Sequence, residues 1–427
     1  MQFLGIFLAV ILLIILSFKG VNIVVGTILS SFVVIFTNKM NVNSVFFGNS
    51  DSYMSGAKEF IGNYMLLFLL SSILSSYFLE SGASECIAEK IIGKSGESSG
   101  FSMLVVLYIV SAPLTYGGIS IFVVFFILIP LSFPLFKKLN IPWEMVSLPI
   151  FLGGATFTMT MLPGSPSIQN NIPIKYLGTS VFSGATIGII SSIICVCFSI
   201  LFMRRELGKQ EGTEHVYPSI FDKSNNKSKT IRFYIAIIPI IILFSSIIIF
   251  GIASDINGVY PAMLLAIIYF MIIHRDIDAL NRDVINAFGP LMFTASSMGF
   301  GNVVAQSESF KMFFQALSDS SSPIVSLNLT SIFFGGITAS SSSSIAIIIE
   351  NFSSYFLDTG IPKDVIHRIT VMSSAVLANM PYCGIVSAVF KMSGIDHKKG
   401  FRHVFVGFTV AHILSLLVAN ILAYYMY

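Results

Sequence analysis

The chain has 427 residues, of which 55% are hydrophobic and 11% are charged, and its mean hydropathy is +0.85. Soluble globular domains carry about 25% charged residues, so this composition excludes that class. The net charge of +3 gives no reason to expect a nucleic-acid partner, because the Lys and Arg residues lie between the apolar runs. These properties predict an all-α polytopic membrane protein whose first partner is the lipid bilayer.

Apolar runs long enough to cross a bilayer recur along the whole chain. They predict spans at residues 2–18, 20–37, 61–79, 142–173, 180–203, 231–251, 258–273, 287–305, 366–390 and 403–425. The first run has no positively charged segment before it and no small-residue cleavage site after it, so we expect a retained span rather than a signal peptide. The polar stretch 204–230 divides the ten spans into two sets of five and is predicted to be a cytoplasmic linker.

Two further apolar pairs, residues 101–134 and 324–350, are interrupted by stretches rich in Gly, Ser and Thr. Each pair is predicted to be a re-entrant hairpin, whose two helices enter and leave on the same side of the bilayer. Each half then has five crossings, and because five is odd the second half enters from the opposite side. The sequence therefore predicts two inverted-topology repeats of five spans each, each with a re-entrant helical hairpin and a broken helix.

The same features follow one another in both halves. Residues 101–173 run from a hairpin through a loop containing Pro142 to a break at Pro163, and residues 324–390 run through a loop containing Pro362 to a break at Pro381. This order predicts a scaffold domain and a transport domain, each built from both halves. The scaffold would take residues 1–79 and 231–305, and the transport domain residues 80–203 and 306–427.

Positive charge is distributed unevenly between the predicted loops. The linker region carries Arg204, Arg205, Lys209, Lys223, Lys227 and Lys229, which predicts a cytoplasmic location for it. Counting outward from the linker, most of the other Lys and Arg residues then also fall on the cytoplasmic side. Reading the hairpins as full crossings would move the later loops to the other side, so the charge bias favours re-entrant hairpins. It also predicts that both termini are extracytoplasmic.

The interruptions are the candidate binding site. Backbone exposed at membrane depth is costly unless it is buried in protein or lines a water-filled space. Glycine allows close backbone approach, hydroxyls both donate and accept, and restarting helices direct N–H groups at a ligand. The predicted substrate-binding residues are Thr115, Gly117, Gly118 and Ser120 at the first tip, Thr338, Ser340, Ser341 and Ser342 at the second, and Pro163, Gly164, Ser165, Asn379 and Pro381 in the breaks. Each could instead be a helix kink or a close helix contact.

None of these four stretches contains Arg or Lys; Lys175 and Arg368 are nearest, and we expect both near the outer surface. Dipoles, amides and hydroxyls would then hold the ligand, which suits a singly charged, hydroxyl-rich anion. His412 is expected to be a packing histidine, while His367 and Glu350 are expected at solvated interfaces. We also predict interfacial amphipathic helices at residues 80–92 and 306–317.

No catalytic or nucleotide-binding motif is present, so an enzyme is not expected. Cys195 and Cys197 lie two apart in an apolar run, on different faces of a helix, and are expected to pack rather than to ligate a metal. No metal and no cofactor is predicted apart from a coupling ion, either a proton or sodium.

The chain resembles the gluconate permease (GntP-type) family within the larger ion-transporter superfamily. The resemblance is carried by Glu80-Ser81-Gly82-Ala83, Ile92-Gly93-Lys94-Ser95-Gly96, Thr115-Tyr116-Gly117-Gly118 and Leu162-Pro163-Gly164-Ser165-Pro166. It implies proton-coupled import of a sugar acid such as gluconate across the cell inner membrane. It also implies an elevator-like motion of the transport domain against the scaffold, and a homodimer.

Two other functions remain open. Relatives in the superfamily often bind substrate with a Ser-Asn-Thr triplet at the hairpin tips; this chain has Gly-Gly-Ile-Ser and Thr-Ala-Ser-Ser there instead. The first alternative is a sodium-coupled di- or tricarboxylate (citrate-like) transporter, and the missing triplet argues against it. A passive organic-anion channel is the second, although a channel has no need of two inverted hairpin tips.

Overall fold

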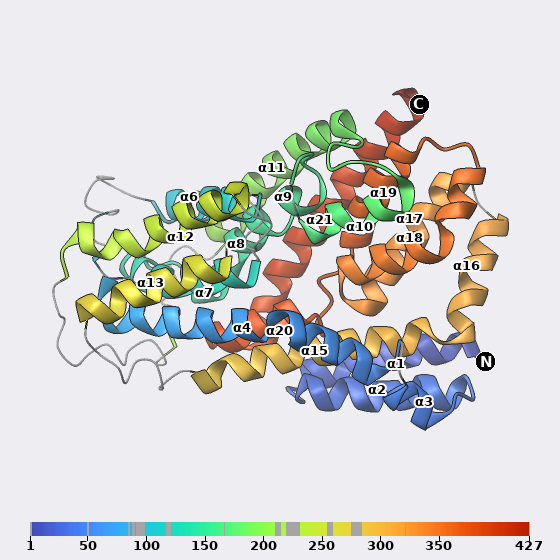
Figure 1. Cartoon of the computed structure of the whole chain (residues 1–427), viewed down its shortest axis with the longest axis horizontal. Helices are drawn as coiled ribbons and strands as arrows, with labels where there is room; N and C mark the ends of the chain where they lie inside the picture. Colours follow the sequence, from blue (N-terminus) through green and yellow to red (C-terminus); the bar gives the residue numbers. More distant parts are fainter. Residues whose placement is uncertain are drawn as a thin grey trace.

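The computed structural model describes residues 2–48, 51–83, 86–87, 90, 99–116, 121–165, 167–209, 215–218, 231–253, 259–274, 284–320 and 322–426. Within these residues the regular structure is entirely helical, which confirms the predicted class. The molecule is elongated, and the start of the first helix and the end of the last lie at the same end of its long axis (Figure 1).

The helices of the first half follow the predicted apolar runs. They are α1 (Gln2–Phe18), α2 (Ile23–Thr37), α3 (Val42–Phe47), α4 (Tyr53–Glu80), α6 (Gly100–Tyr116), α7 (Ile121–Lys138), η1 (Trp143–Met145), α8 (Ser147–Gly154), α9 (Phe157–Thr160), α10 (Ile168–Leu177) and α11 (Ala185–Gly208). The predicted span 142–173 is thus divided into short helices, because the chain leaves the helical conformation on either side of the single turn α9.

The helices of the second half also follow the predicted apolar runs. They are α12 (Phe233–Ala253), α13 (Val259–His274), η3 (Val284–Ala287), α15 (Phe288–Ala305), α16 (Glu308–Ser320), α17 (Pro323–Thr338), α18 (Ser341–Asp358), α19 (Lys363–Ala375), α20 (Gly384–Ser393) and α21 (His397–Met426). Helix α16 is strongly amphipathic, as predicted, whereas much of the other amphipathic stretch, 80–92, lies outside the described residues.

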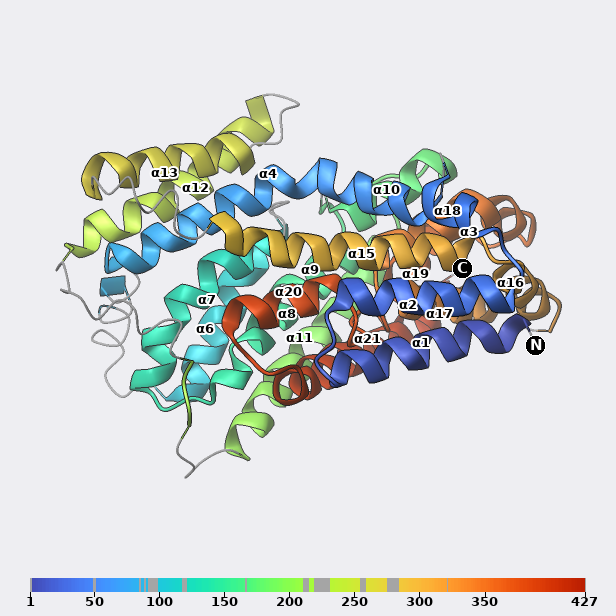
Figure 2. The same ribbon diagram turned by 90° about the horizontal axis from the view of Figure 1, so that it is seen from below.

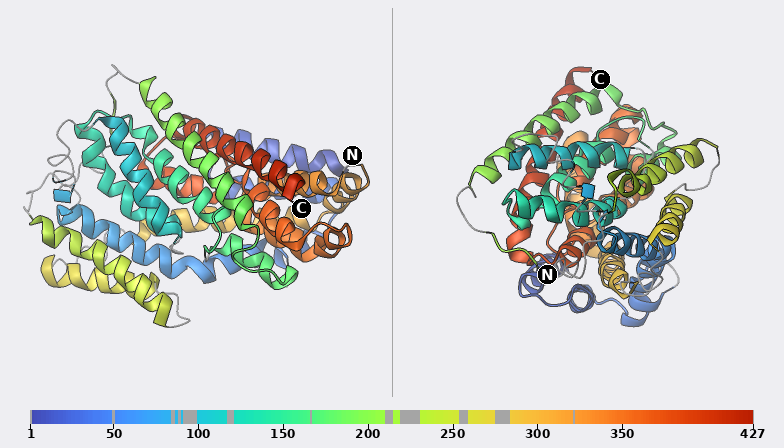
Figure 3. Two further views of the ribbon diagram at one scale, coloured as in Figure 1. Left: turned by 90° about the horizontal axis from the view of Figure 1, so that it is seen from above. Right: turned by 90° about the vertical axis from the view of Figure 1, so that its left-hand side faces the viewer.

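Helices α4 and α15 pack against each other along the long axis and form the centre of one side of the molecule (Figure 2). Helix α2 packs on α15, and α13 packs on α4. Helices α11 and α21 lie side by side across the opposite side (Figure 3). Helix α6 packs on α8 in the first half, and α17 packs on α19 in the second.

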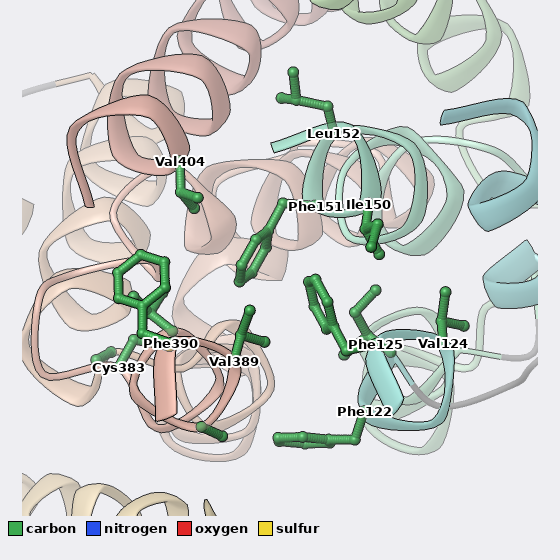
Figure 4. Close-up of a cluster of buried hydrophobic side chains, with 14 of the residues drawn as sticks. Phe122, Val124, Phe125, Ile150, Phe151, Leu152, Cys383, Val389, Phe390 and Val404 are labelled. Carbon is green, nitrogen blue, oxygen red and sulfur yellow. The ribbon is translucent and has the colours of Figure 1, made fainter. Parts of the chain in front are cut away.

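A hydrophobic cluster joins the two halves. Phe122 and Phe125 of α7 and Phe151 of α8 lie beside Val389 and Phe390 of α20 (Figure 4). The rings of Phe125 and Phe151 have centroids 4.7 Å apart. Beside this cluster, the indole of Trp143, itself only 2% exposed, donates a hydrogen bond to the carbonyl of Ser393 at 2.8 Å.

By length and composition, two of the described helices can cross a bilayer alone, Ala185–Gly208 and His397–Met426. A third qualifies if the bent helix formed by Tyr53–Leu66 and Phe68–Phe78 is taken as one span. Eight other apolar helical stretches have 10–17 residues. The helices therefore lie where the spans were expected, and the number of crossings and the re-entrant hairpins stay predictions.

Polar contacts join the end of α11 to the start of α21, and the linker to the loop after α7. His403 Nδ1 lies 3.1 Å from Glu206 Oε2, and Lys209 also pairs with Glu206. Tyr217 lies in the linker. Its hydroxyl is within hydrogen-bonding distance of the carbonyls of Phe136 (2.9 Å) and Ile141 (3.0 Å) and can donate to either. Burial raises the pKa of Tyr217 to about 12, so this phenol stays protonated and able to donate at neutral pH.

Replacing Trp143 by Phe should destabilise the protein by about 1–3 kcal/mol, because the carbonyl of Ser393 loses its buried donor. The change is measured as the loss of helical circular dichroism on heating in detergent. Tyr424→Phe is the control, since it removes the polar atom of an aromatic side chain that is 81% exposed and should change stability by less than about 0.5 kcal/mol. Equal melting of both variants would contradict the importance of this contact.

Candidate functional site

The second hairpin tip is built from its own hydroxyls. Helix α17 ends at Thr338, Ala339 takes a left-handed conformation with φ of +47°, and Ser340 caps α18 by accepting from the N–H of Ser343 at 3.3 Å. Thr338 is buried, and its hydroxyl lies 2.7 Å from the carbonyl of Phe334. Of the predicted binding residues at this tip, Thr338 and Ser340 therefore have local structural partners.

The hydroxyls of Ser340 and Ser342 lie 3.2 Å apart, so Ser342 is tied to the cap as well. Ser341 is different, because its hydroxyl accepts a hydrogen bond from Gln169 Nε2 at 3.3 Å. Gln169 stands at the start of α10 in the first half. The contact therefore joins the first break to the tip of the second hairpin.

The first hairpin tip is tied to the first break. The hydroxyls of Thr115 and Thr158 lie 2.9 Å apart, and the phenol of Tyr116 donates to the carbonyl of Pro163 at 2.9 Å. Thr115 is 1% exposed. The other predicted residues of this tip, Gly117, Gly118 and Ser120, lie outside the described residues.

The first break contains Pro163, Gly164 and Ser165 between α9 and α10. Gly164 has φ of +82° and donates its N–H to the carbonyl of Val181 at 2.9 Å. Ser165 is completely buried, and its carbonyl accepts from Asn170 Nδ2 at 3.1 Å. This break is thus a packed structure whose polar groups have partners within the protein.

Arg368 is the main correction to the sequence analysis. It was expected near the outer surface, yet its side chain is completely buried. Helix α19 places the guanidinium between the first break and the loop that follows α10, where Nε donates to the carbonyl of Ser183 at 3.0 Å and Nη1 donates to Asn170 Oδ1 at 3.0 Å. Nη1 also reaches the carbonyl of Thr160 at 3.4 Å, and Nη2 reaches those of Val181 (3.4 Å) and Ser183 (2.7 Å).

Two glycines make room for this guanidinium. A Cβ on Gly184 would lie 2.6 Å from the Cβ of Arg368, and a Cβ on Gly188 would lie 2.1 Å from the carbonyl oxygen of Met161. Gly184 also has φ of +64°, a conformation that favours glycine. The N-terminal turn of α11 can therefore approach the break closely, which shields Arg368 from solvent.

Two histidines flank the same break. His367 was expected at a solvated interface, but it is completely buried, with Nδ1 2.8 Å from the hydroxyl of Thr179 and Nε2 3.4 Å from Asn170 Oδ1. His412 is buried too, with Nδ1 2.9 Å from the carbonyl of Phe408. His412 is therefore a packing histidine with a partner, as predicted. The side chain of Glu350 lies outside the described set.

The second break is the stretch between the end of α19 at Ala375 and the start of α20 at Gly384. The phenol of Tyr382 donates to the carbonyl of Gly336 at 2.5 Å, so this break is tied to the second hairpin. Pro381 is buried. Asn379 is 4% exposed, and its Nδ2 has no hydrogen-bond partner.

Two amide groups, one at each break, thus have unused hydrogen-bonding capacity. Gln169 Oε1 is buried without a partner, as is Asn379 Nδ2. Such groups are costly, and several buried Ser and Thr hydroxyls of the described residues also lack a partner. Asn379 was among the predicted site residues, and Gln169 was not. The sequence feature that could have pointed to Gln169 is its position beside the residue where a helix restarts.

The described residues hold no group of three or more His, Cys, Asp or Glu that could bind a metal ion. Cys195 is buried and Cys197 is exposed, in agreement with the expected placement on different helix faces. Among the described residues, the polar side chains around the two breaks are amides, hydroxyls, the imidazoles of His367 and His412, and the buried guanidinium of Arg368.

Comparison with known proteins gives three findings. Residues 1–272 match the family model described as GntP family permease. The chain is 27% identical over 455 residues to the "uncharacterized transporter YxjC" of Bacillus subtilis (strain 168), with 95% of both chains covered. It also aligns with the crystal structure of the YdaH transporter of Alcanivorax borkumensis over 88% of each chain, with 12% identity and a TM-score of 0.43.

Replacing Gly188 by Ala should destabilise the protein by about 1–3 kcal/mol, because the added methyl group would overlap the carbonyl of Met161 beside Arg368. Gly208→Ala in the same helix is the control, since its Cβ would meet nothing within 4 Å. Thermal unfolding in detergent compares the two. Stability of G188A equal to that of G208A would contradict the close packing described around Arg368.

Proposed function

We propose that this chain, which belongs to the GntP permease family, imports a small organic anion by secondary active transport. The family and the apolar helices support a multi-pass membrane transporter. The proposal adds the substrate, a sugar acid such as gluconate, coupling to protons, and an elevator-like motion. It places the chain in the cell inner membrane as a homodimer with both termini extracytoplasmic.

The contact between Gln169 and Ser341 is the observation that carries the proposal. It joins the break of one half to the hairpin tip of the other, at 3.3 Å. Paired broken helices from two repeats are the usual place of the binding site in secondary transporters. The unpartnered amide groups of Gln169 and Asn379 supply an acceptor and a donor, which a substrate with hydroxyl and carboxylate groups would satisfy.

The inverted repeat is supported by how the elements pack. Each hairpin packs on the first part of its own broken helix, α6 on α8 and α17 on α19. Helix α4 packs on its counterpart α15, and α11 packs on its counterpart α21. A pseudo-two-fold axis relating the halves would place corresponding helices in contact in this way. The scaffold and transport domains proposed from the sequence follow the same division.

Purified protein in proteoliposomes should accumulate labelled gluconate above its external concentration when the lumen is alkaline. A protonophore should abolish that accumulation, and replacing sodium by choline should leave it unchanged. Accumulation that requires sodium would favour the citrate-like alternative, tested with citrate in parallel. Uptake that only equilibrates across the membrane would favour a passive channel, and no uptake of gluconate, other hexonates, hydroxy acids or citrate would contradict the proposal.

Gln169→Leu and Asn379→Leu should each raise the KM for gluconate about tenfold or more, since each removes one hydrogen bond to the bound acid. Ser341→Val, which removes the partner of Gln169, should abolish uptake while leaving the protein in the membrane. Asn171→Leu is the control, because Asn171 neighbours the site on the same helix and is exposed. An unchanged KM in both Leu variants would contradict the assignment of the amides.

A further inference from the structure

Arg368 is completely buried, and no carboxylate of the described residues lies within 4.0 Å of its guanidinium. Its guanidinium directs its N–H groups at three backbone carbonyls and at the Asn170 carboxamide. Among the described residues, the ion pairs within 4.0 Å all involve Glu206, which lies on another part of the fold. Asp364, one turn before Arg368 on α19, is partly exposed and makes no ion pair with it.

A buried charge is normally paired, because taking it out of water costs more than neutral hydrogen bonds return. The carbonyl partners of Arg368 are that of Thr160, at the end of α9, and those of Val181 and Ser183, in the loop between α10 and α11. Carbonyl oxygens alone would favour a cation at this place. The guanidinium adds a full positive charge among them, which would favour an anion nearby.

We propose that Arg368 is a positioning residue that makes the site selective for a carboxylate through its charge, without touching the substrate. Its donors are occupied by the break, so it orients no substrate atom directly. Its location links it to the site, since Asn170, which accepts from Nη1, is the neighbour of Gln169 along α10. The inference rests on the proposed function, because it concerns the anion which that function transports.

The expected size follows from Coulomb's law. A carboxylate about 8 Å from the guanidinium, at an effective dielectric constant of about 20, would gain roughly a thirtyfold preference over a neutral analogue. A site held by amides and hydroxyls alone would lack this preference. The measured quantity is therefore the ratio of the dissociation constants of gluconamide and gluconate.

Two substitutions remove the charge effect by different routes. Arg368→Gln deletes the charge and some of its hydrogen bonds. Ser183→Asp keeps Arg368 and adds a carboxylate at a residue whose carbonyl Arg368 contacts, just before the N-terminus of α11, where negative charge is favourable. The two controls are Arg368→Lys, which keeps the charge but loses hydrogen bonds, and Ser180→Asp, which adds the same carboxylate at an exposed position.

Binding of gluconate and gluconamide to full-length wild type and to each variant in detergent is measured by displacement of labelled gluconate, with thermal unfolding alongside. We expect S183D to lower gluconate affinity about tenfold or more, with gluconamide affinity within about twofold of wild type. R368Q should show the same change in ratio if it folds, and R368K and S180D should retain the wild-type ratio.

A wild-type ratio in S183D, with the variant folded, would overturn the inference and leave Arg368 a structural residue. Loss of stability and of both affinities in parallel in R368Q and R368K would overturn it also, because a charge effect separates the two ligands. Failure of the wild type to bind or transport any organic acid would overturn the proposed function, and this inference with it.

Discussion

The organisation of this protein depends on satisfying backbone groups where its helices are interrupted. An open backbone carbonyl in a low-dielectric environment is costly, and each break leaves several. Around the first break, Arg368 donates to the carbonyl of Thr160 and to those of Val181 and Ser183 in the loop after α10, and Tyr116 donates to the carbonyl of Pro163. At the second hairpin, Tyr382 donates to the carbonyl of Gly336. Long side chains from neighbouring elements thus replace the missing helical bonds.

These ties cross between the halves and couple elements far apart in the sequence. Arg368 enters the first break from the second half, and Gln169 reaches Ser341 from the first half. Displacing the first break alone would leave a buried guanidinium without its acceptors. A displacement that carries both breaks and the second hairpin together would keep these bonds. Such a unit is what an elevator-like motion would require of a transport domain.

Local signals in the sequence were sufficient for the helices, for the turn between α17 and α18 and for the interruptions around α9 and before α20, because apolar runs and Gly, Pro and Ser interruptions reflect the nearby backbone. The place of Arg368 could not be obtained in this way. Arg368 follows shortly after Pro362 and Lys363, a pattern that suggests a helix end in solvent. Burial of its guanidinium is favourable only because it donates to carbonyls of residues that are distant in the sequence. Gly184 and Gly188 indicate that another segment approaches α11 closely, but the sequence does not show which segment that is. The sequence also did not show that the hydroxyls of Thr338 and Ser340 form hydrogen bonds within the tip itself.

The two hairpins differ in how they meet their broken helices, although the pattern that predicts them is shared. In the first half the close approach is made by Gly153 of α8 against Tyr108 and Ser111 of α6; in the second it is made by Gly335 of α17 against Ser374 of α19. At the first tip, Thr115 bonds to Thr158, which precedes the break of the same half. At the second tip, Ser341 bonds to Gln169 beside the first break, and Gly336 bonds to Tyr382 in the second break. Repeats related by symmetry need not contribute equally to a site. A substrate held beside the second tip would lie between amides from both halves, with Arg368 behind the first break to set the charge that it accepts.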